Sequence, residues 1–337
     1  MEANKPFKIL SIDGGGIKGL YSASVIARLE EKTGKKSSDC FDMICGTSTG
    51  GLIALGLSSG HSANDLENLY YTKGNKIFPT YELRIPRLFQ RSVLHFFTQT
   101  FFFGKFSNKK LKKVLEDTFG NTRLGDLDNL VCIPSFNLTS GMPRMFKFPH
   151  KEGGFYTDKE IPLVDAALAT SAAPTFFPIH EYDDTLYIDG GVWANNPSLC
   201  GLLEALDHFI DGENYTHAEI LSVSSISKSN SWTSKVRKRR SFVGWKSRLI
   251  ETSMDGQAYF THFFLKRAIK KIDVKSQYVR IDSPPLSSDQ MKVLEMDRAD
   301  KKALSTLRSL GRQIGAEKSL SKDVTRFYET TKTYKTR

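Results

Sequence analysis

Short apolar runs alternate with stretches of helical periodicity along the N-terminal part of the chain. Residues 7–12 form an apolar run of strand length, and a glycine turn separates them from residues 18–32, whose apolar positions recur at helical spacing. A second apolar run over residues 41–45 leads through another glycine-containing turn into an apolar helix over residues 52–57. Strands that alternate with helices in this way predict a parallel sheet with crossover connections.

The same patterns continue to the C-terminal part of the chain. Further helices are expected over residues 64–77, 108–119, 163–172, 198–210 and 299–318. Further strands are expected over residues 130–138, 186–188, 220–224 and 278–281. We therefore expect an α/β protein. After Lys322 the composition turns polar and basic, which predicts a frayed tail over residues 321–337.

Two stretches depart from the alternation of strands and helices, and we interpret both as insertions. Residues 80–107 form a Phe-rich insertion, with seven Phe between Leu88 and Phe106. The other stretch, residues 227–271, is basic: eleven Lys and Arg accompany two acids between Lys235 and Lys271. This cluster accounts for most of the net charge of +11 and would attract phosphate groups, although a solvated basic face without a specific partner is the plainer interpretation.

The composition fits a globular protein of a reducing compartment. Apolar residues make up 39% of the 337 residues and charged residues 25%, which excludes extended disorder. No apolar run approaches the roughly 18 residues that a membrane span requires, and no secretory signal is visible. The four cysteines are expected to be free thiols, and we expect neither a disulfide scaffold nor a structural zinc site.

The first glycine turn, Gly14-Gly15-Gly16-Ile17-Lys18-Gly19, follows a strand and opens a helix. Such a turn points backbone N–H groups at an anion. It also matches the dinucleotide-binding pattern, but that pattern requires an acid after the second strand to hold a ribose, whereas Asp42 lies within the run. We therefore favour an anion hole for another oxyanion over nicotinamide-dependent oxidoreductase chemistry, and over a purely structural turn.

The second glycine turn names a candidate nucleophile. Gly46-Thr47-Ser48-Thr49-Gly50 is a G-x-S-x-G sequence between a strand and a helix, the context of a nucleophile elbow. A serine hydroxyl needs a base, and the histidines that could follow it in a hydrolase triad (His208, His217 and His262) have no motif around them. The better candidate is Asp189, which ends an apolar strand before Gly190-Gly191, although Asp-Gly is also common in turns.

Together, in this order, these motifs resemble the patatin-like phospholipase family. The matching residues are Asp13 to Gly19, Gly46 to Gly50 and Asp189-Gly190-Gly191, supported by the stretch 169–178 and by Asn195-Asn196-Pro197. The resemblance implies a three-layer α/β/α fold with a mainly parallel central sheet and helical insertions. It implies a catalytic domain over residues 7–225, with residues 226–320 as a basic C-terminal part packed on the same domain. Lys18 in place of Arg, and Gly191 in place of Ala, are variants that this family tolerates.

The resemblance also implies a chemistry and roles for the residues of the motifs. Ser48 would attack a lipid ester carbonyl while Asp189 accepts its proton, and Gly14, Gly15 and Gly16, with Lys18 nearby, would form the oxyanion hole. Gly46 and Gly50 would shape the elbow, and Gly190 and Gly191 the turn after Asp189. No metal or cofactor is needed. A catalytically idle membrane-binding or nucleotide-sensing module is the alternative, although every chemical residue is present.

Membrane phospholipids would be the substrate, so we expect a cytoplasmic protein that associates peripherally with the inner face of the membrane. For membrane contact we name Phe96, Phe97, Phe101, Phe102 and Phe103, whose alternative roles are the core of a helical insertion or a subunit contact. For contact with anions we name Lys235, Arg237, Lys238, Arg239 and Arg240.

Some bacterial patatin-like proteins of similar size are antiphage effectors switched on by cyclic nucleotides, and the compact architecture resembles them. A cyclic dinucleotide is therefore the expected activator, although no motif for nucleotide recognition is visible. Nucleic acid is not an expected partner. The oligomeric state stays open, with a dimer among the options.

Overall fold

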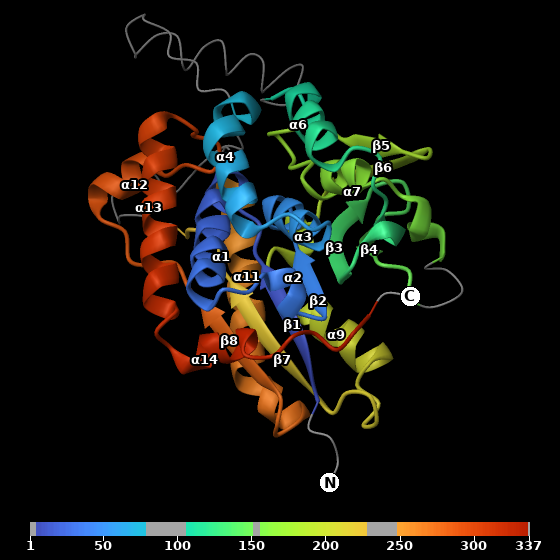
Figure 1. Ribbon diagram of the computed structural model, residues 1–337. Helices are drawn as coiled ribbons and strands as arrows, with labels where there is room; N and C mark the ends of the chain where they lie inside the picture. The colour runs from blue at the N-terminus through green and yellow to red at the C-terminus, as the bar shows by residue number, and fades with distance from the viewer. Residues whose placement is uncertain (1–4, 79–105, 151–155, 228–247, 336–337) are drawn as a thin grey trace, which may run out of the picture.

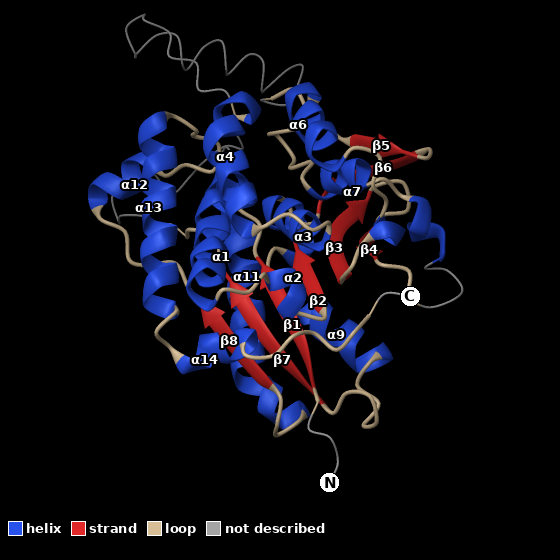
Figure 2. Ribbon diagram, in the orientation of Figure 1, coloured by secondary structure: helices blue, strands red, loops and turns tan. Residues whose placement is uncertain are grey.

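The computed structural model describes residues 5–78, 106–150, 156–227 and 248–335. Within these residues an eight-stranded sheet lies between layers of helices, as the ribbon in Figure 1 shows. The strand order is β5-β6-β3-β2-β1-β7-β8, and β4 pairs with β3 outside this path. Figure 2 shows the strands as a central layer. The α/β class and the mainly parallel central sheet are thereby confirmed.

The parallel centre of the sheet is built from the apolar runs of the sequence. β1 (Pro6–Ile12) lies between β2 (Met43–Gly46) and β7 (His217–Val223), parallel to both, and β8 (Gln277–Ile281) extends the sheet beyond β7. Every residue of β1 after Pro6 is buried, as expected for a strand covered on both faces. Ile12 at the end of β1 pairs with Gly46 at the end of β2, so the two glycine turns begin side by side.

The other edge of the sheet is antiparallel and determines where Asp189 lies. β3 (Leu130–Asn137) is parallel to β2 but antiparallel to both β4 (Met142–Lys147) and β6 (Thr185–Asp189). β5 (His180–Tyr182) pairs with β6 at the edge. β2 pairs only with the first part of β3, and β6 pairs with its last part, where Ser135 lies opposite Asp189. The end of β6 therefore lies just beyond the end of β2.

Helices cover the sheet and its antiparallel edge. α1 (Gly19–Thr33) packs against α13 (Lys301–Lys318) and α4 (Ala63–Ile77), with α3 (Thr49–Ser58) against β2 and β3. α9 (Ser198–His208) packs on β1, β2 and β7, and α11 (Arg248–Ile272) packs on β8, α8 (Gly191–Ala194) and α9. The remaining helices are α2 (Ser37–Cys40), α6 (Lys109–Phe119), α7 (Leu163–Thr170), α12 (Ser288–Val293) and α14 (Lys322–Thr325), with 3-10 turns at Gly16–Lys18, Leu124–Asp126, Tyr156–Glu160 and Arg326–Tyr328.

Two interpretations of the sequence need correction. The basic stretch is expected to be an insertion, but its described part forms α11, which packs on β8 and α8 and buries Leu265 and Ile269 in the core. The tail does not fray over residues 321–335: Phe327 and Tyr328 are buried, and the backbone N–H groups of Thr333 and Tyr334 donate to the Asp42 carboxylate at 2.9 and 2.8 Å. In this position the tail crosses beneath α2 (Figure 1).

Two other expectations concern thiols and membrane spans. All four cysteines are free; Cys40, Cys45 and Cys132 are buried and Cys200 is half-buried. Among the helices of the described residues, none combines the length and the apolar character that crossing a bilayer requires.

Candidate active site

Ser48 lies in the tight turn between β2 and α3, at the N-terminus of the helix. Its φ of 54° lies in the left-handed region that residues other than glycine rarely adopt. The turn depends on two glycines: a Cβ at Gly46 would lie 2.1 Å from the Gly50 carbonyl oxygen, and a Cβ at Gly50 would lie 2.3 Å from that of Ile12. The strained turn therefore presents the hydroxyl at the positive end of the α3 dipole, where developing negative charge is stabilised.

Asp189, the last residue of β6, meets this hydroxyl directly. The Ser48 Oγ donates a hydrogen bond of 2.6 Å to Asp189 Oδ2, across 141 positions of the chain. The other carboxylate oxygen, Oδ1, accepts the backbone N–H of Gly191 at 2.7 Å, which fixes the orientation of the carboxylate. The two side chains thus have the geometry of a nucleophile and its general base.

Thr170, the last residue of α7, connects the two catalytic segments. Its hydroxyl accepts the backbone N–H of Ser48 at 3.0 Å and donates to the Pro134 carbonyl in β3 at 2.5 Å. Its carbonyl accepts the N–H of Gly190, immediately after Asp189. Thr170 therefore positions both the elbow and the strand end. Thr170 lies in the stretch 169–178 that resembles the family, but no pattern in the sequence indicates its contact with Ser48.

Burial makes Asp189 a stronger base than an ordinary carboxylate. Its side chain is buried, and desolvation raises its pKa to about 7, although the hydrogen bonds from Ser48 and Gly191 act in the opposite direction. A carboxylate with this pKa is closer to the pKa of a serine hydroxyl than an exposed one would be, so proton transfer from Ser48 costs less free energy.

This pKa predicts the pH dependence of hydrolysis. Asp189 must be ionised to accept a proton, so kcat/KM for a soluble short-chain ester should rise with pH until about 7 and level off above it. The measurement is a pH–rate profile of the wild type. Replacement of His208, His217 or His262 by Ala should leave the profile unchanged; disappearance of the inflection in one of these variants would assign the titrating base to that histidine instead.

The first glycine turn lies against the nucleophile. A Cβ at Gly14 would lie 3.3 Å from Ser48 Cβ, so the absence of a side chain permits this approach. The N–H of Gly14 donates to the Asn195 carbonyl at 3.0 Å and is engaged within the protein. Gly16 has a φ of 59°, and the side chain of Lys18 is buried. Of the three glycine amides, those of Gly15 and Gly16 are the better candidates for the oxyanion hole.

A buried ion pair supports the glycine turn. The Arg280 guanidinium in β8 contacts both carboxylate oxygens of Asp13, at 2.5 and 3.2 Å. Burial raises the pKa of Asp13, and the positive charge of Arg280 opposes this effect. Because Asp13 directly precedes Gly14, the pair joins the turn to the far strand of the sheet. No sequence pattern indicates Arg280, since it is one of many basic residues and has no motif around it.

An apolar pocket begins at Ser48. Its walls come from α3, α4, α6, the segment after α7 and the region after α12, and it is lined by Gly16, Thr49, Leu52, Tyr70, Ile77, Phe78, Leu111, Ser171, Ala173, Phe176, Phe177 and Met296. Eight of these twelve residues have apolar side chains, so the pocket suits a hydrocarbon chain better than a polar substrate.

The other candidates take no part in this site within the described residues. His208 interacts with Glu204, His217 with Glu219 and His262 with Tyr278. Within the described part of the chain, none of these three histidines contacts Ser48. The Asp42 carboxylate accepts the backbone N–H groups of Lys8 and of Thr333 in the tail. Because both of its oxygens are engaged within the protein, Asp42 is unsuited to hold a ribose. The five Phe named for membrane contact and the five basic residues named for anion contact lie outside the described residues.

Comparison with known proteins extends the similarity beyond the motifs. Residues 10–199 match the family model described as patatin-like phospholipase. A protein of Escherichia coli named cGAMP-activated phospholipase is 31% identical over 325 residues, covering 91% of this chain and 88% of the relative. Proteins of the same name from Pseudomonas aeruginosa and Vibrio cholerae are 32% and 34% identical over 305 and 330 residues, covering 90% and 92% of this chain and 86% and 90% of the relatives. The similarity therefore includes the C-terminal part of the chain.

Proposed function

The chain belongs to the patatin-like phospholipase family and is a lipid acyl hydrolase, and we propose that it cleaves ester-linked fatty acids from membrane phospholipids with a Ser48–Asp189 dyad. The observation that supports the dyad most strongly is the buried hydrogen bond of 2.6 Å between the two side chains. The dyad needs no third residue, because burial raises the pKa of Asp189 to about 7 against the opposing effect of its hydrogen bonds from Ser48 and Gly191.

The reaction proceeds in two steps. Asp189 accepts the proton of the Ser48 hydroxyl as Oγ forms a bond to the ester carbonyl carbon, and the resulting oxyanion receives hydrogen bonds from the amides of Gly15 and Gly16. The intermediate collapses with return of the proton from Asp189 to the departing alcohol, which leaves an acyl-enzyme. Asp189 then deprotonates a water molecule, which attacks the acyl carbon; the bond to Oγ breaks, the fatty acid leaves, and the proton on Asp189 returns to Ser48 Oγ.

The apolar pocket is the proposed site of the fatty acyl chain. Ser48 lines this pocket together with Ile77, Phe78 and Phe177, so an acyl chain bound among the apolar side chains can place its carbonyl carbon beside the nucleophile. Burial of each methylene contributes about 0.8 kcal/mol. Long-chain esters should therefore bind more tightly than short-chain ones.

Activation by a cyclic dinucleotide is the second part of the proposal. It is supported by the similarity to three proteins named cGAMP-activated phospholipase over about nine-tenths of this chain. A role in antiphage defence would follow from such a switch. The experiment incubates the protein with defined phospholipids, with and without a panel of cyclic dinucleotides, and measures the fatty acid released. Release only with a nucleotide supports the switch, equal release without one overturns it, and no release under any condition contradicts the phospholipase proposal.

We propose that α11 contacts the cytoplasmic face of the membrane peripherally, in addition to the Phe-rich stretch named from the sequence, whose five named Phe lie outside the described residues. Its outer face carries four exposed aromatic side chains: Tyr259 (69% exposed), Phe260 (62%), Phe263 (41%) and Phe264 (39%). Lys266, Arg267, Lys270 and Lys271 follow them and are exposed as well. An aromatic face beside clustered cations complements an anionic lipid surface. The helix also contacts the segment after Asp189, because Gln257 Oε1 accepts the backbone N–H of Asn196 at 3.0 Å.

The double variant Phe260→Ser, Phe263→Ser should bind anionic vesicles at least about tenfold more weakly, because two aromatic rings no longer enter the interface. Sedimentation with phosphatidylglycerol vesicles measures the binding. Leu320→Ser, at another exposed apolar position (87% exposed), is the matched control and should bind as the wild type does. Hydrolysis of a soluble ester should be unchanged in both. Equal binding by the double variant and the wild type, or loss of a dimer in the double variant, contradicts the membrane assignment.

A further inference from the structure

A second cluster of ionisable side chains lies at the opposite end of the sheet from Ser48. Glu204 and His208 occupy one face of α9, one helical turn apart, and His150 follows β4. Phe209, next to His208, stacks on Phe7 at the start of β1 with ring centroids 4.9 Å apart. The catalytic residues instead follow the carboxyl ends of β1 and β2. The cluster is therefore separate from the hydrolase site.

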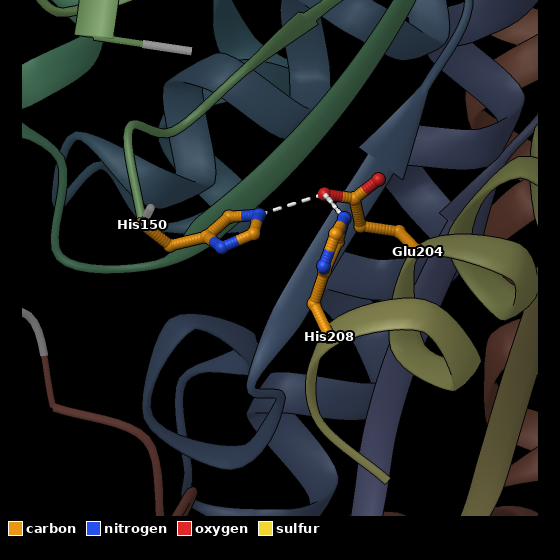
Figure 3. A group of neighbouring side chains, drawn as sticks. All are labelled: His150, Glu204 and His208. Carbon is orange, nitrogen blue, oxygen red and sulfur yellow. Dashed lines mark hydrogen bonds and ion pairs between the residues drawn. The ribbon is translucent and has the colours of Figure 1, made fainter. Parts of the chain in front are cut away.

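The donor atoms of the three side chains converge on one point. Figure 3 shows both imidazole rings turning a nitrogen toward the same oxygen of Glu204. His150 Nε2 lies 2.7 Å and His208 Nε2 lies 3.9 Å from Glu204 Oε1, and all three ligand atoms lie within 4.8 Å of one another. A tetrahedral Zn²⁺ with bonds of about 2.0–2.2 Å holds adjacent donors about 3.3 Å apart. Small side-chain movements would bring the three donors to that spacing.

We propose that His150, Glu204 and His208 bind one divalent transition-metal ion, with Zn²⁺ as the best fit. Two imidazoles and one carboxylate are borderline donors that suit Zn²⁺, Co²⁺ or Ni²⁺, whereas Ca²⁺ and Mg²⁺ prefer oxygen alone. His208 is 19% exposed, so water can reach the fourth coordination position. This site goes beyond the phospholipase activity and does not depend on it.

The surroundings prepare the carboxylate for this role. The Glu204 side chain is buried, and each of its carboxylate oxygens has a partner of its own. The ammonium of Lys147 contacts Glu204 Oε2, so Glu204 Oε1 faces the two imidazoles. Lys147 does not bind the ion itself but orients the Glu204 carboxylate, as hydrogen-bonded neighbours orient metal ligands in other proteins.

An ion bound at this site would connect two parts of the chain that are distant in sequence. One ligand belongs to the segment after β4 and two belong to the end of α9, and the aromatic ring of Phe209 packs 4.8 Å from that of His150. Such packing limits the access of water on this side, which strengthens metal–ligand interactions. An ion shared between these segments stabilises the folded state and not the unfolded one.

The test is equilibrium binding of Zn²⁺ to the full chain after chelator treatment, with removal of any affinity tag. One ion per chain is expected, together with a rise in Tm, and His208→Ala should weaken binding by more than about 100-fold, since it removes a direct ligand. His180→Ala is the matched control, because His180 also pairs with a carboxylate, that of Asp165 at 3.2 Å, outside the cluster. It should bind as the wild type does.

The visible spectrum of the Co²⁺-substituted protein identifies the ligands independently of stability. Tetrahedral coordination by nitrogen and oxygen should give visible bands that His208→Ala abolishes and His180→Ala retains. A thiolate-to-cobalt charge-transfer band would instead reveal cysteine ligation, with Cys200 one turn before Glu204 as the candidate, and would overturn the ligand set. Equal Zn²⁺ affinity in the wild type and His208→Ala, or no binding by the wild type, would overturn the site itself.

Discussion

Ser48→Ala should lower phospholipid hydrolysis by about 10⁴-fold or more, because no other group can form the acyl-enzyme in its place. Asp189→Asn should lower it by about 10²–10⁴-fold, the usual contribution of a general base. Neither variant should lose its fold. Asn cannot accept the Ser48 proton, yet it fills the same space and can still accept the N–H of Gly191, which donates at 2.7 Å in the wild type.

Measurement of fatty acid release, with far-UV circular dichroism to verify folding, checks both variants. Asp165→Asn is a matched control: this carboxylate pairs with His180 on the same side of the fold and should be dispensable for hydrolysis. An Asp189→Asn protein with wild-type kcat would show that some other base activates Ser48. An active Ser48→Ala protein would exclude covalent catalysis at this position.

Arg280→Met should be the most destabilising of the substitutions considered, with a loss of about 3–5 kcal/mol in the free energy of unfolding. It leaves the carboxylate of Asp13 buried without its cation, and an uncompensated buried charge is far more costly than the loss of an exposed ion pair. In the wild type, Asp13 is 3% exposed and Arg280 contacts both of its oxygens. Urea unfolding measures the effect.

Two further variants separate this explanation from a general packing defect. The double variant Asp13→Asn, Arg280→Met should recover part of the lost stability, because it no longer buries an unpaired charge. Arg28→Met, which breaks the exposed ion pair with Glu31 at 2.9 Å, should cost less than about 1 kcal/mol. An Arg280→Met protein as stable as Arg28→Met would contradict the role assigned to the buried pair.

The fold of the parallel centre could be predicted because local patterns determine it. The apolar runs at β1 and β2, and the glycines that follow them, specify strand, turn and helix over short distances, and adjacent parallel strands bring the turns together. The strands β4 and β5 were missed. β4 is amphipathic and short, and β5 has three residues, so neither carries an apolar run.

The catalytic pair could be proposed from motifs, but its surroundings could not. Thr170 and Arg280 contribute through contacts with residues far away in sequence. Thr170 lies in the stretch 169–178 that resembles the family, but nothing there indicates its contact with Ser48, and no motif surrounds Arg280. The same holds for His150 and Glu204, 54 positions apart, which is why the sequence predicted no metal site. The tail was expected to fray on composition alone, whereas Phe327 and Tyr328 anchor it by burial.

Labelling with a fluorophosphonate followed by mass spectrometry, with and without cyclic dinucleotides, shows whether Asp189 activates Ser48 for covalent catalysis. We expect one adduct per chain, located on Ser48, with labelling at least about 100-fold slower in Asp189→Asn. An adduct on a different residue, or equally fast labelling of Ser48 in Asp189→Asn, would contradict this expectation.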